Sequence, residues 1–516
     1  AITGEIENAI WEADTESARI VLTAEPQERR VVFHRWWGPL SKIQEFLGRL
    51  SQEDSEQPTD PFEIDRISWP EENPWNSWMR FGDFDFLAGG QSAVISTWSG
   101  DVWRVDGLDE TLEKLEWQRI ATGLSQPLGL LTRSQGDGEQ VLVMGRDQIT
   151  ELVDIDGDGE TDLYRGFNVD PMNSPHFHEP AVGLQEGPQG KLYYLKAARH
   201  AKLPLHPQHG TLIEVEADGS TSRVIATGFR APNGLAVDAD DLFWGSDQEG
   251  HWMPANRINR ITRGSFQGNH WSGSMLSGER EMGSAHDPPL LWIHPTVDRS
   301  PSAQLRVPEG AWGELSGKLL GLSYGTGEVY LILEDEVEGY HQGALVPLPI
   351  RIPTGAMRGR FHPDGSLYLC GLFGWSSDRT EPGGFYRVRK TETAQPLPLK
   401  IRAMESGLVI EFSEAITTSE EKLADAFQLE GWDYRYSSNY GSPRLKLGGG
   451  GEGTTQFSVE EVKLFNDDRS VHLKIEGMQP AMQMDLDWSL DFGDLGQHSS
   501  SIHFTVHRLA GEGQER

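Results

Sequence analysis

Short runs in which apolar and polar residues alternate, separated by turns rich in glycine and proline, occupy most of this chain. Alternation with a period of two is typical of half-buried β-strands, and the turns lie too close together for βαβ units. The clearest runs share an apolar entry, a turn with glycine and a β-rich segment. They are WMRFGDFDFLAGGQSAVISTW (78–98), HFHEPAVGLQEGPQGKLYYLK (176–196), GAWGELSGKLLGLSYGTGEVYLIL (310–333) and MRGRFHPDGSLYLCGLFGW (357–375).

The chain also repeats itself, because ATGLSQPLGLL (121–131) echoes ATGFRAPNGLA (226–236). A unit of about 40 to 50 residues suits a propeller blade of four strands. Counting such units from Trp78 to Arg389 predicts an all-β protein built on a six-bladed β-propeller. The predicted domains are an N-terminal β-rich appendage and linker over 1–62, the propeller over 63–393, and a C-terminal β-sandwich of the immunoglobulin or fibronectin type III kind over 394–516.

Composition narrows the range of partners. The 516 residues include 45 Lys+Arg and 79 Asp+Glu, which gives a formal net charge of -34. Nucleic acids and anionic membranes need a basic face, so neither is expected as a partner. Cys370 is the single cysteine, which excludes an internal disulfide and a CxxCH haem attachment within this sequence. No run of about 20 apolar residues occurs, so this chain is not expected to insert into a membrane.

The segment DIDGDGETD (154–162) predicts a calcium site. Carboxylates at alternate positions, with a glycine for the sharp turn, can wrap oxygen atoms around one hard cation. We expect a structural ion here, because the loop joins two strands of one blade. The predicted ligands are the side chains of Asp154, Asp156, Asp158 and Asp162 and the backbone carbonyl of Glu160.

Two polar residues precede strands at the same place in their blades. Arg230 stands in the turn FRAPNGL, and His178 precedes the run GKLYYLK. The first strand of each blade lines the central channel of a propeller, so we expect these side chains to meet at one mouth of it. A histidine there can act as a general base, and an arginine can face a bound anion or a developing oxyanion.

The segment MRGRF carries Arg358 and Arg360 on the same side of a strand, since they are two positions apart. Two neighbouring arginines need an anion. One interpretation is a cofactor with several carboxylates or an acidic substrate. The other is a set of structural carboxylates within this acidic chain.

Histidines gather at six positions, and His-x-His followed by His-x-x-His has a spacing that could bind a transition metal. For His206 and His209 we expect ordinary loop histidines instead. The aromatic run WDYRYSSNYGSP (432–443) suits a sugar, but a packed corner rich in tyrosine is the favoured interpretation. The six histidines are His176, His178, His200, His206, His209 and His251.

Longer stretches resemble a known family. ENPWNSWMRFG, WSGDVWRV, RAPNGLAV, MRGRFHPDGSLYLCGLFGW and WDYRYSSNYGSP are similar to large propeller proteins of planctomycete-like bacteria, often labelled membrane-bound dehydrogenases or haem-binding proteins. The resemblance covers about residues 60 to 510. Because that propeller is commonly followed by a c-type cytochrome, the resemblance implies a cytochrome domain or subunit as a partner. It also implies a periplasmic or extracellular location.

The blade layout is also distantly similar to soluble quinoprotein glucose and sorbosone dehydrogenases, six-bladed enzymes that bind pyrroloquinoline quinone (PQQ) on the propeller axis. The sequence departs from that family at Gly325, where the family has a lysine, and at Ala198 and Arg199, where it has an Asp-Gln pair. This resemblance implies catalytic roles for His178 and Arg230, and cofactor contacts from Gln126, Arg230, Gln248, Arg358 and Arg360.

These resemblances predict a PQQ-type dehydrogenase that oxidises a sugar or other alcohol and passes electrons to a c-type cytochrome. In this prediction, His178 takes the hydroxyl proton. Two alternatives stay open, because a fold alone does not choose a function. One is a carbohydrate lyase or hydrolase that acts on an acidic polysaccharide, and the other is a non-catalytic binding or scaffold module of a larger cytochrome-containing protein.

Overall fold

The computed structural model describes residues 9–13, 18–22 and 60–511, with short gaps at 136–137, 239–241, 279–282, 284 and 374–380. The chain forms two compact units, Ala1–Thr59 and Asp60–Arg516. In the first unit, β1 (Ala9–Ala13) pairs antiparallel with β2 (Ala18–Leu22). Most of the predicted N-terminal appendage over 1–62 lies outside the described residues.

The regular secondary structure of the second unit is almost entirely β-strand, which confirms the predicted all-β class. The first three sheets each have four strands that pair in chain order. They consist of β4–β7 (Phe81–Phe86, Ser92–Thr97, Val102–Asp106, Glu116–Ala121), β8–β11 (Gly129–Gln135, Gly138–Met144, Ile149–Val153, Leu163–Asn168) and β12–β15 (Ala181–Glu186, Leu192–Lys196, Thr211–Val215, Ser222–Thr227).

Three further sheets follow. The last of them is completed by β3 (Phe62–Ile67), which pairs with β26 from the other end of the unit. The strands are β16–β19 (Pro232–Val237, Phe243–Asp247, Asn256–Ile261, Leu291–Ile293), β20–β23 (Pro301–Arg306, Leu319–Ser323, Glu328–Val337, Tyr340–Arg351) and β24–β26 (Gly355–Phe361, Leu367–Leu372, Gly383–Lys390).

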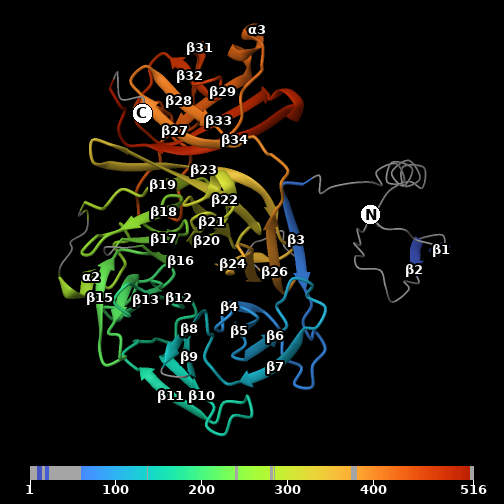
Figure 1. The fold of residues 1–516 in the computed structure, drawn as a ribbon. Helices are drawn as coiled ribbons and strands as arrows, with labels where there is room; N and C mark the ends of the chain where they lie inside the picture. Colours follow the sequence, from blue (N-terminus) through green and yellow to red (C-terminus); the bar gives the residue numbers. More distant parts are fainter. Residues whose placement is uncertain are drawn as a thin grey trace. The chain divides into compact units, whose positions relative to one another are not determined.

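The first strands of these six sheets form a closed ring. β4, β8, β12, β16, β20 and β24 each contact the next first strand, and β24 contacts β4 again. Figure 1 shows the six sheets around a common centre. Burial follows from this arrangement. Inner strands such as β13 are buried along their whole length, because sheets pack on both faces, whereas the edge strand β11 is largely exposed.

The C-terminal part adds two sheets. One has the order β27-β28-β32-β31, and the other, β34-β33-β29-β30, continues the fifth ring sheet through the pairing of β34 with β23. A single apolar core runs from Leu331 in β22 through Leu408 in β28 to Leu486 in β33. The strands are β27–β34 (Pro398–Met404, Gly407–Phe412, Phe427–Trp432, Thr455–Phe457, Val459–Phe465, Ser470–Ile475, Ala481–Asp491, Gln497–Val506).

Helices are short in the described part of the chain, and none is long and apolar enough to cross a membrane. They are α2 (Ser274–Ser277), α3 (Glu420–Leu423) and the 3-10 turns η1 (Gly313–Leu315), η2 (Ala424–Ala426), η3 (Leu447–Gly449) and η4 (Gly493–Leu495).

Candidate functional site

The turn before β16 is held by a buried carboxylate. Asp247, the last residue of β17, accepts hydrogen bonds from the backbone N–H groups of Arg230 at 2.7 Å and Ala231 at 2.6 Å. It also accepts the N–H of Gln248 at 2.9 Å. Burial raises the pKa of Asp247 to about 6, although the three donors around it favour ionisation. One aspartate thus fixes both segments that carry the predicted residues Arg230 and Gln248.

Arg230 is buried, with 4% of its surface exposed, and its guanidinium contacts several neighbouring side chains. Its Nη2 atom donates to Nδ1 of His200 at 2.9 Å, and its Nη1 atom donates to Oε1 of Gln248 at 3.4 Å. A Cβ atom at position 250 would overlap the guanidinium, so Gly250 is required there. Arg230 therefore packs closely against its neighbours. These two side-chain hydrogen bonds are to neutral groups, while the charges of Asp247 and Glu249 act on it from nearby.

His178 is presented as a neutral base. Its Nδ1 atom lies 2.8 Å from the carbonyl oxygen of Ala198. A carbonyl only accepts, so Nδ1 carries the proton and Nε2 keeps a lone pair. Burial, and then the positive charge of Arg230, lower the pKa of His178 to about 4. The imidazole ring of His200 lies 5.5 Å away, which joins His178 to the Arg230 cluster.

A segment of the C-terminal part reaches this cluster. Tyr440 forms a bridge with His251, and its ring lies 5.3 Å from the Arg230 guanidinium carbon. Nδ1 of His251 donates to the carbonyl of Ser438 at 2.9 Å. The expected tyrosine-rich corner is divided, because Tyr434 is buried whereas Tyr440 is 50% exposed. The periodicity of the sequence gives no signal that Tyr440 would lie beside Arg230.

Gln126 is linked to this cluster through a further residue, Arg146. It adopts a positive φ of 47° and accepts a hydrogen bond from Nη1 of Arg146 at 3.4 Å. Nη2 of Arg146 donates to the carbonyl of His176 at 2.6 Å. Gln126 thus approaches the loop that carries His178 through Arg146, a residue that no pattern in the sequence singles out.

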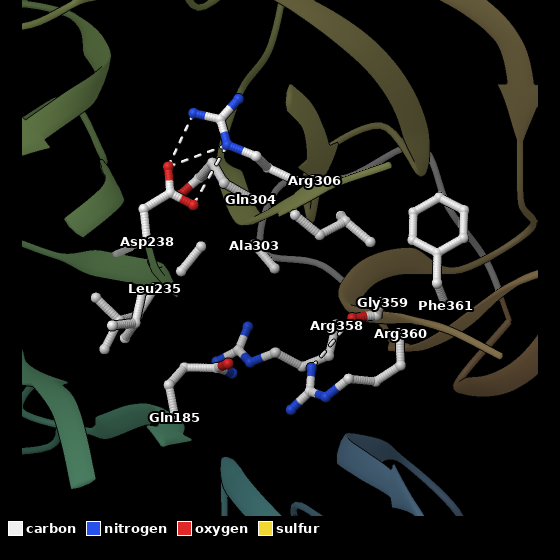
Figure 2. A pocket seen from close by; sticks show the side chains of 13 residues that line it. Gln185, Leu235, Asp238, Ala303, Gln304, Arg306, Arg358, Gly359, Arg360 and Phe361 are labelled. Atoms are coloured by element: carbon white, nitrogen blue, oxygen red, sulfur yellow. Dashed lines mark hydrogen bonds and ion pairs between the residues drawn. The ribbon is translucent and has the colours of Figure 1, made fainter. Parts of the chain in front are cut away.

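Arg358 and Arg360 line a cavity with Gln185 and with residues 235–238 (Figure 2). Nη1 of Arg358 donates to Oδ1 of Asn233 at 3.4 Å, and Asn233 is the second residue of β16, three positions after Arg230. That the arginine pair shares one mouth of the channel with Arg230 therefore stays a prediction.

The arginine pair already has anions. Oδ1 of Asp83 lies 3.4 Å from Nη2 of Arg360, and its Oδ2 lies 3.8 Å from Nε of Arg358. Asp85 lies 3.7 Å from Nε of Arg360. Asp83 and Asp85 are two positions apart on β4, so an Asp-x-Asp strand matches the Arg-x-Arg strand beside it. Structural carboxylates thus take the role that was considered for a cofactor.

The acidic segment 154–162 forms the loop between β10 and β11. Oxygen atoms of Asp154, Asp156 and Asp162 all lie within 4.8 Å of one another, and these three side chains are exposed. Oδ2 of Asp162 accepts the N–H of Ile155 at 2.7 Å, which closes the loop. Asp158 is not part of this group, and its Oδ1 accepts the N–H of Glu160 at 2.8 Å. The predicted ligation by the backbone carbonyl of Glu160 stays a prediction.

No family model and no curated protein matches this sequence. Several solved structures are similar to this chain. A glucose dehydrogenase described as an oxidoreductase from Thermus thermophilus is 16% identical at a TM-score of 0.47, covering 63% of this chain and 99% of that chain. The soluble aldose sugar dehydrogenase of Escherichia coli is 13% identical at a TM-score of 0.43, covering 64% of this chain and 100% of that chain.

A luciferin-regenerating enzyme also matches, at 14% identity and a TM-score of 0.42, covering 64% of this chain and 96% of that chain. Proteins with different activities thus resemble this chain to a similar degree. At these TM-scores the similarity carries no argument about function, and function is argued from the side chains.

Proposed function

We propose that this chain is an oxidoreductase that oxidises a sugar or another alcohol, with His178 as the base. The observation that carries this proposal is the state of His178. Its Nδ1–H is engaged by the carbonyl of Ala198, and its pKa is lowered to about 4, so Nε2 is free to accept a proton at neutral pH. A base of this kind can take the proton of a substrate hydroxyl group.

We interpret the ring of six sheets as a six-bladed propeller and the C-terminal sheets as a β-sandwich. The closed contacts of the first strands support the propeller. The domain boundaries at 62/63 and 393/394 remain predictions, although β3 already begins at Phe62 and completes the last sheet. Membership of the planctomycete propeller–cytochrome family also remains a prediction.

PQQ is the proposed cofactor, and the residues at the His178 mouth fit it in part. Nε of Arg230 is buried without a hydrogen-bond partner, so this guanidinium retains a donor for an oxygen-rich ligand. His200 and Gln248 lie on its other two nitrogens. These three residues would hold the cofactor. Arg358 and Arg360 are not assigned to it, because they are already paired with Asp83.

When bound, PQQ supplies a quinone that accepts a hydride. The protein groups do the rest. His178 takes the hydroxyl proton on Nε2 while the Ala198 carbonyl keeps Nδ1–H in place. The positive charge of Arg230 favours negative charge that develops on the substrate oxygen. Gln248 and His200 keep the guanidinium in position. The exposed ring of Tyr440 can pack against a sugar face.

The remaining predictions belong to the same proposal. A calcium ion in the loop 154–162 would be structural, held by Asp154, Asp156 and Asp162. Electrons would leave to a c-type cytochrome, and the protein would work in the periplasm or outside the cell.

Dye reduction by PQQ-reconstituted protein across a panel of sugars and alcohols tests the proposal. We expect reduction that depends on PQQ and on His178. Purified protein that neither binds PQQ by absorbance nor reduces the dye would refute it. Cleavage of an acidic polysaccharide would then support the lyase alternative, and the absence of both activities would support a binding module.

A further inference from the structure

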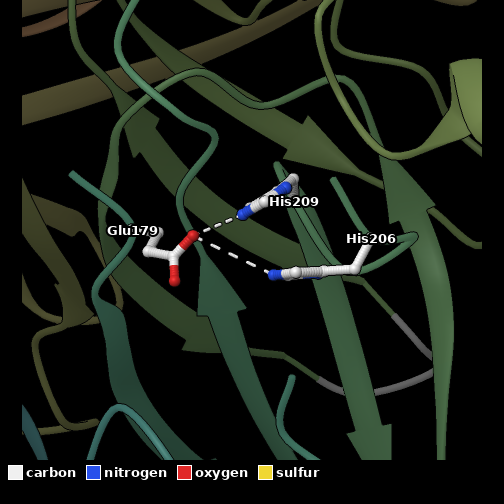
Figure 3. A group of neighbouring side chains, drawn as sticks. All are labelled: Glu179, His206 and His209. Carbon is white, nitrogen blue, oxygen red and sulfur yellow. Dashed lines mark hydrogen bonds and ion pairs between the residues drawn. The ribbon is translucent and has the colours of Figure 1, made fainter. Parts of the chain in front are cut away.

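A second cluster of chemically active side chains lies next to the candidate base but is separate from it. Glu179 follows His178 in sequence, and it is fully buried, as is His209. Nε2 of His209 lies 2.5 Å from Oε2 of Glu179, and Nε2 of His206 lies 3.9 Å from the same oxygen. Figure 3 shows both imidazole rings directing a nitrogen toward this one carboxylate.

His206 is the unexplained member of the cluster. The residue is 6% exposed, and neither of its ring nitrogens has a hydrogen-bond partner. Buried polar atoms are nearly always satisfied, so two unsatisfied nitrogens on one ring need a reason. The ring is stacked on that of His209 with centroids 3.6 Å apart. An apolar side chain would fill such a place without this loss.

We propose that Glu179, His206 and His209 bind a divalent transition-metal ion of the zinc class. Two histidines and one carboxylate form a common ligand set for zinc, with nitrogen at about 2.0–2.1 Å and a fourth position for water. The ligand atoms all lie within 4.8 Å of one another, so modest side-chain movements complete the set. The same set is also compatible with other imidazole-preferring metals, and zinc is the one to test first.

The surroundings of the cluster fit this role. Ser174 Oγ donates to Glu179 Oε2 at 2.8 Å, which orients the carboxylate, as is usual around a metal ligand. Two cations beside Glu179 are directed at other oxygens of this residue. Arg146 lies 3.4 Å from Oε1, and Nζ of Lys196 lies 3.5 Å from the backbone carbonyl oxygen.

Metal binding would break one hydrogen bond to His209. The N–H of Leu205 donates to Nδ1 of His209 at 3.1 Å, so in the metal-free ring the proton sits on Nε2. A metal at Nε2 moves that proton to Nδ1 and releases the Leu205 N–H. Leu205 is 60% exposed, and water can take over the released hydrogen bond.

The ion would join two loops that carry candidate site residues. Glu179 belongs to the loop before β12, with His178, and His206 and His209 belong to the loop between β13 and β14, with His200. A shared metal would fix both loops and so position His178 and His200. This role is structural and does not depend on the proposed oxidoreductase activity.

The test uses the full chain, expressed with added zinc, dialysed, and analysed for metal by mass spectrometry. We expect about one zinc per chain and, after replacement by Co²⁺, a visible spectrum of low-coordinate cobalt. His206→Gln should weaken zinc binding by at least the 10–100-fold that follows loss of a supporting group. Because His206 makes no side-chain hydrogen bond, this variant loses none and should still fold.

His341→Gln is the matched control, since His341 lies 3.8 Å from the carboxylate of Glu336 without a second histidine. It should bind zinc as the unchanged chain does. Zinc should also raise the melting temperature of the unchanged chain and of this control, but not that of His206→Gln. Substoichiometric zinc with only the hexaaqua cobalt spectrum, or equal zinc binding by His206→Gln, would overturn the proposal and leave a metal-free histidine stack.

Discussion

The chemistry of His178 depends on two neighbours. The Ala198 carbonyl selects the tautomer, and burial together with Arg230 lowers the pKa to about 4. We therefore predict that kcat/KM stays constant from about pH 8 down to about pH 5 and falls only below that, as the imidazole gains a proton. His178→Ala should lower turnover by about 100-fold or more. Steady-state rates of the reconstituted enzyme measure both effects, and an acid limb near the ordinary histidine pKa would contradict the assignment.

Asp83 is predicted to matter for stability more than any exposed carboxylate. Replacing it by asparagine leaves Arg358, which is 1% exposed, without its counter-charge. Removing one partner of a buried ion pair costs about 3–5 kcal/mol of unfolding free energy. Asp106→Asn is the control, because Asp106 pairs with Arg104 at the surface, where such a pair contributes about 1 kcal/mol or less. Urea unfolding of both variants should show this difference, and equal losses would refute it.

At the scale of elements, the loop between β10 and β11 should bind calcium through part of its acidic set. Asp154→Asn should abolish the stabilisation that calcium gives, because Asp154 belongs to the group of close oxygen atoms. Asp158→Asn should weaken it less, since Asp158 lies outside that group. Native-state binding raises stability by mass action, so melting temperatures with calcium and with chelator measure the effect. A melting temperature that does not respond to chelation would exclude a structural ion.

Local alternation was enough to predict the strands but not their partners. The runs at 78–98 and 357–375 correspond to β4–β5 and β24–β25, as a period of two requires. The pairing of β3 with β26, and of β34 with β23, joins segments far apart in sequence, which no local pattern specifies. The arginine pair shows the same limit. The pattern of MRGRF does not specify its partners, although FGDFDF on the adjacent first strand carries the matching acids.

The candidate site was predictable to the same extent. His178, Arg230 and Gln248 come together because each lies at the end of a strand in a repeated unit, and that position can be read from the sequence. Tyr440 and Ser438 reach the site from the C-terminal part, so their proximity depends on how two sets of sheets pack. His206 was expected to be an ordinary loop histidine, since burial without a hydrogen-bond partner becomes visible only in three dimensions.

Over the whole molecule, two electrostatic effects oppose each other as the pH falls. The net charge of -34 means strong self-repulsion at neutral pH, which should relax toward the isoelectric point of about 4.8. Buried histidines act in the other direction. Burial lowers the pKa to about 4 in His178, His206, His286 and His294.

Between about pH 6.5 and pH 4, those four histidines are neutral in the folded chain and protonated in the unfolded chain. Unfolding therefore takes up protons in this range, and the unfolding free energy decreases as the pH is lowered. Asp247 and Asp298, whose pKa burial raises to about 6, hold protons only when folded and offset part of this uptake. Four groups against two leave an uptake of about two protons near pH 5.

High salt separates the two effects, because it screens surface repulsion but not buried groups. We predict that in high salt the unfolding free energy, measured by urea titration, falls steadily from pH 6.5 to pH 4.5. The slope should decrease by about one proton in His294→Gln, which removes one of the four histidines. At low salt the decline should be shallower, since relaxing repulsion then adds stability. A high-salt stability that is constant or rises over this range would mean that the buried histidines do not control the acid response.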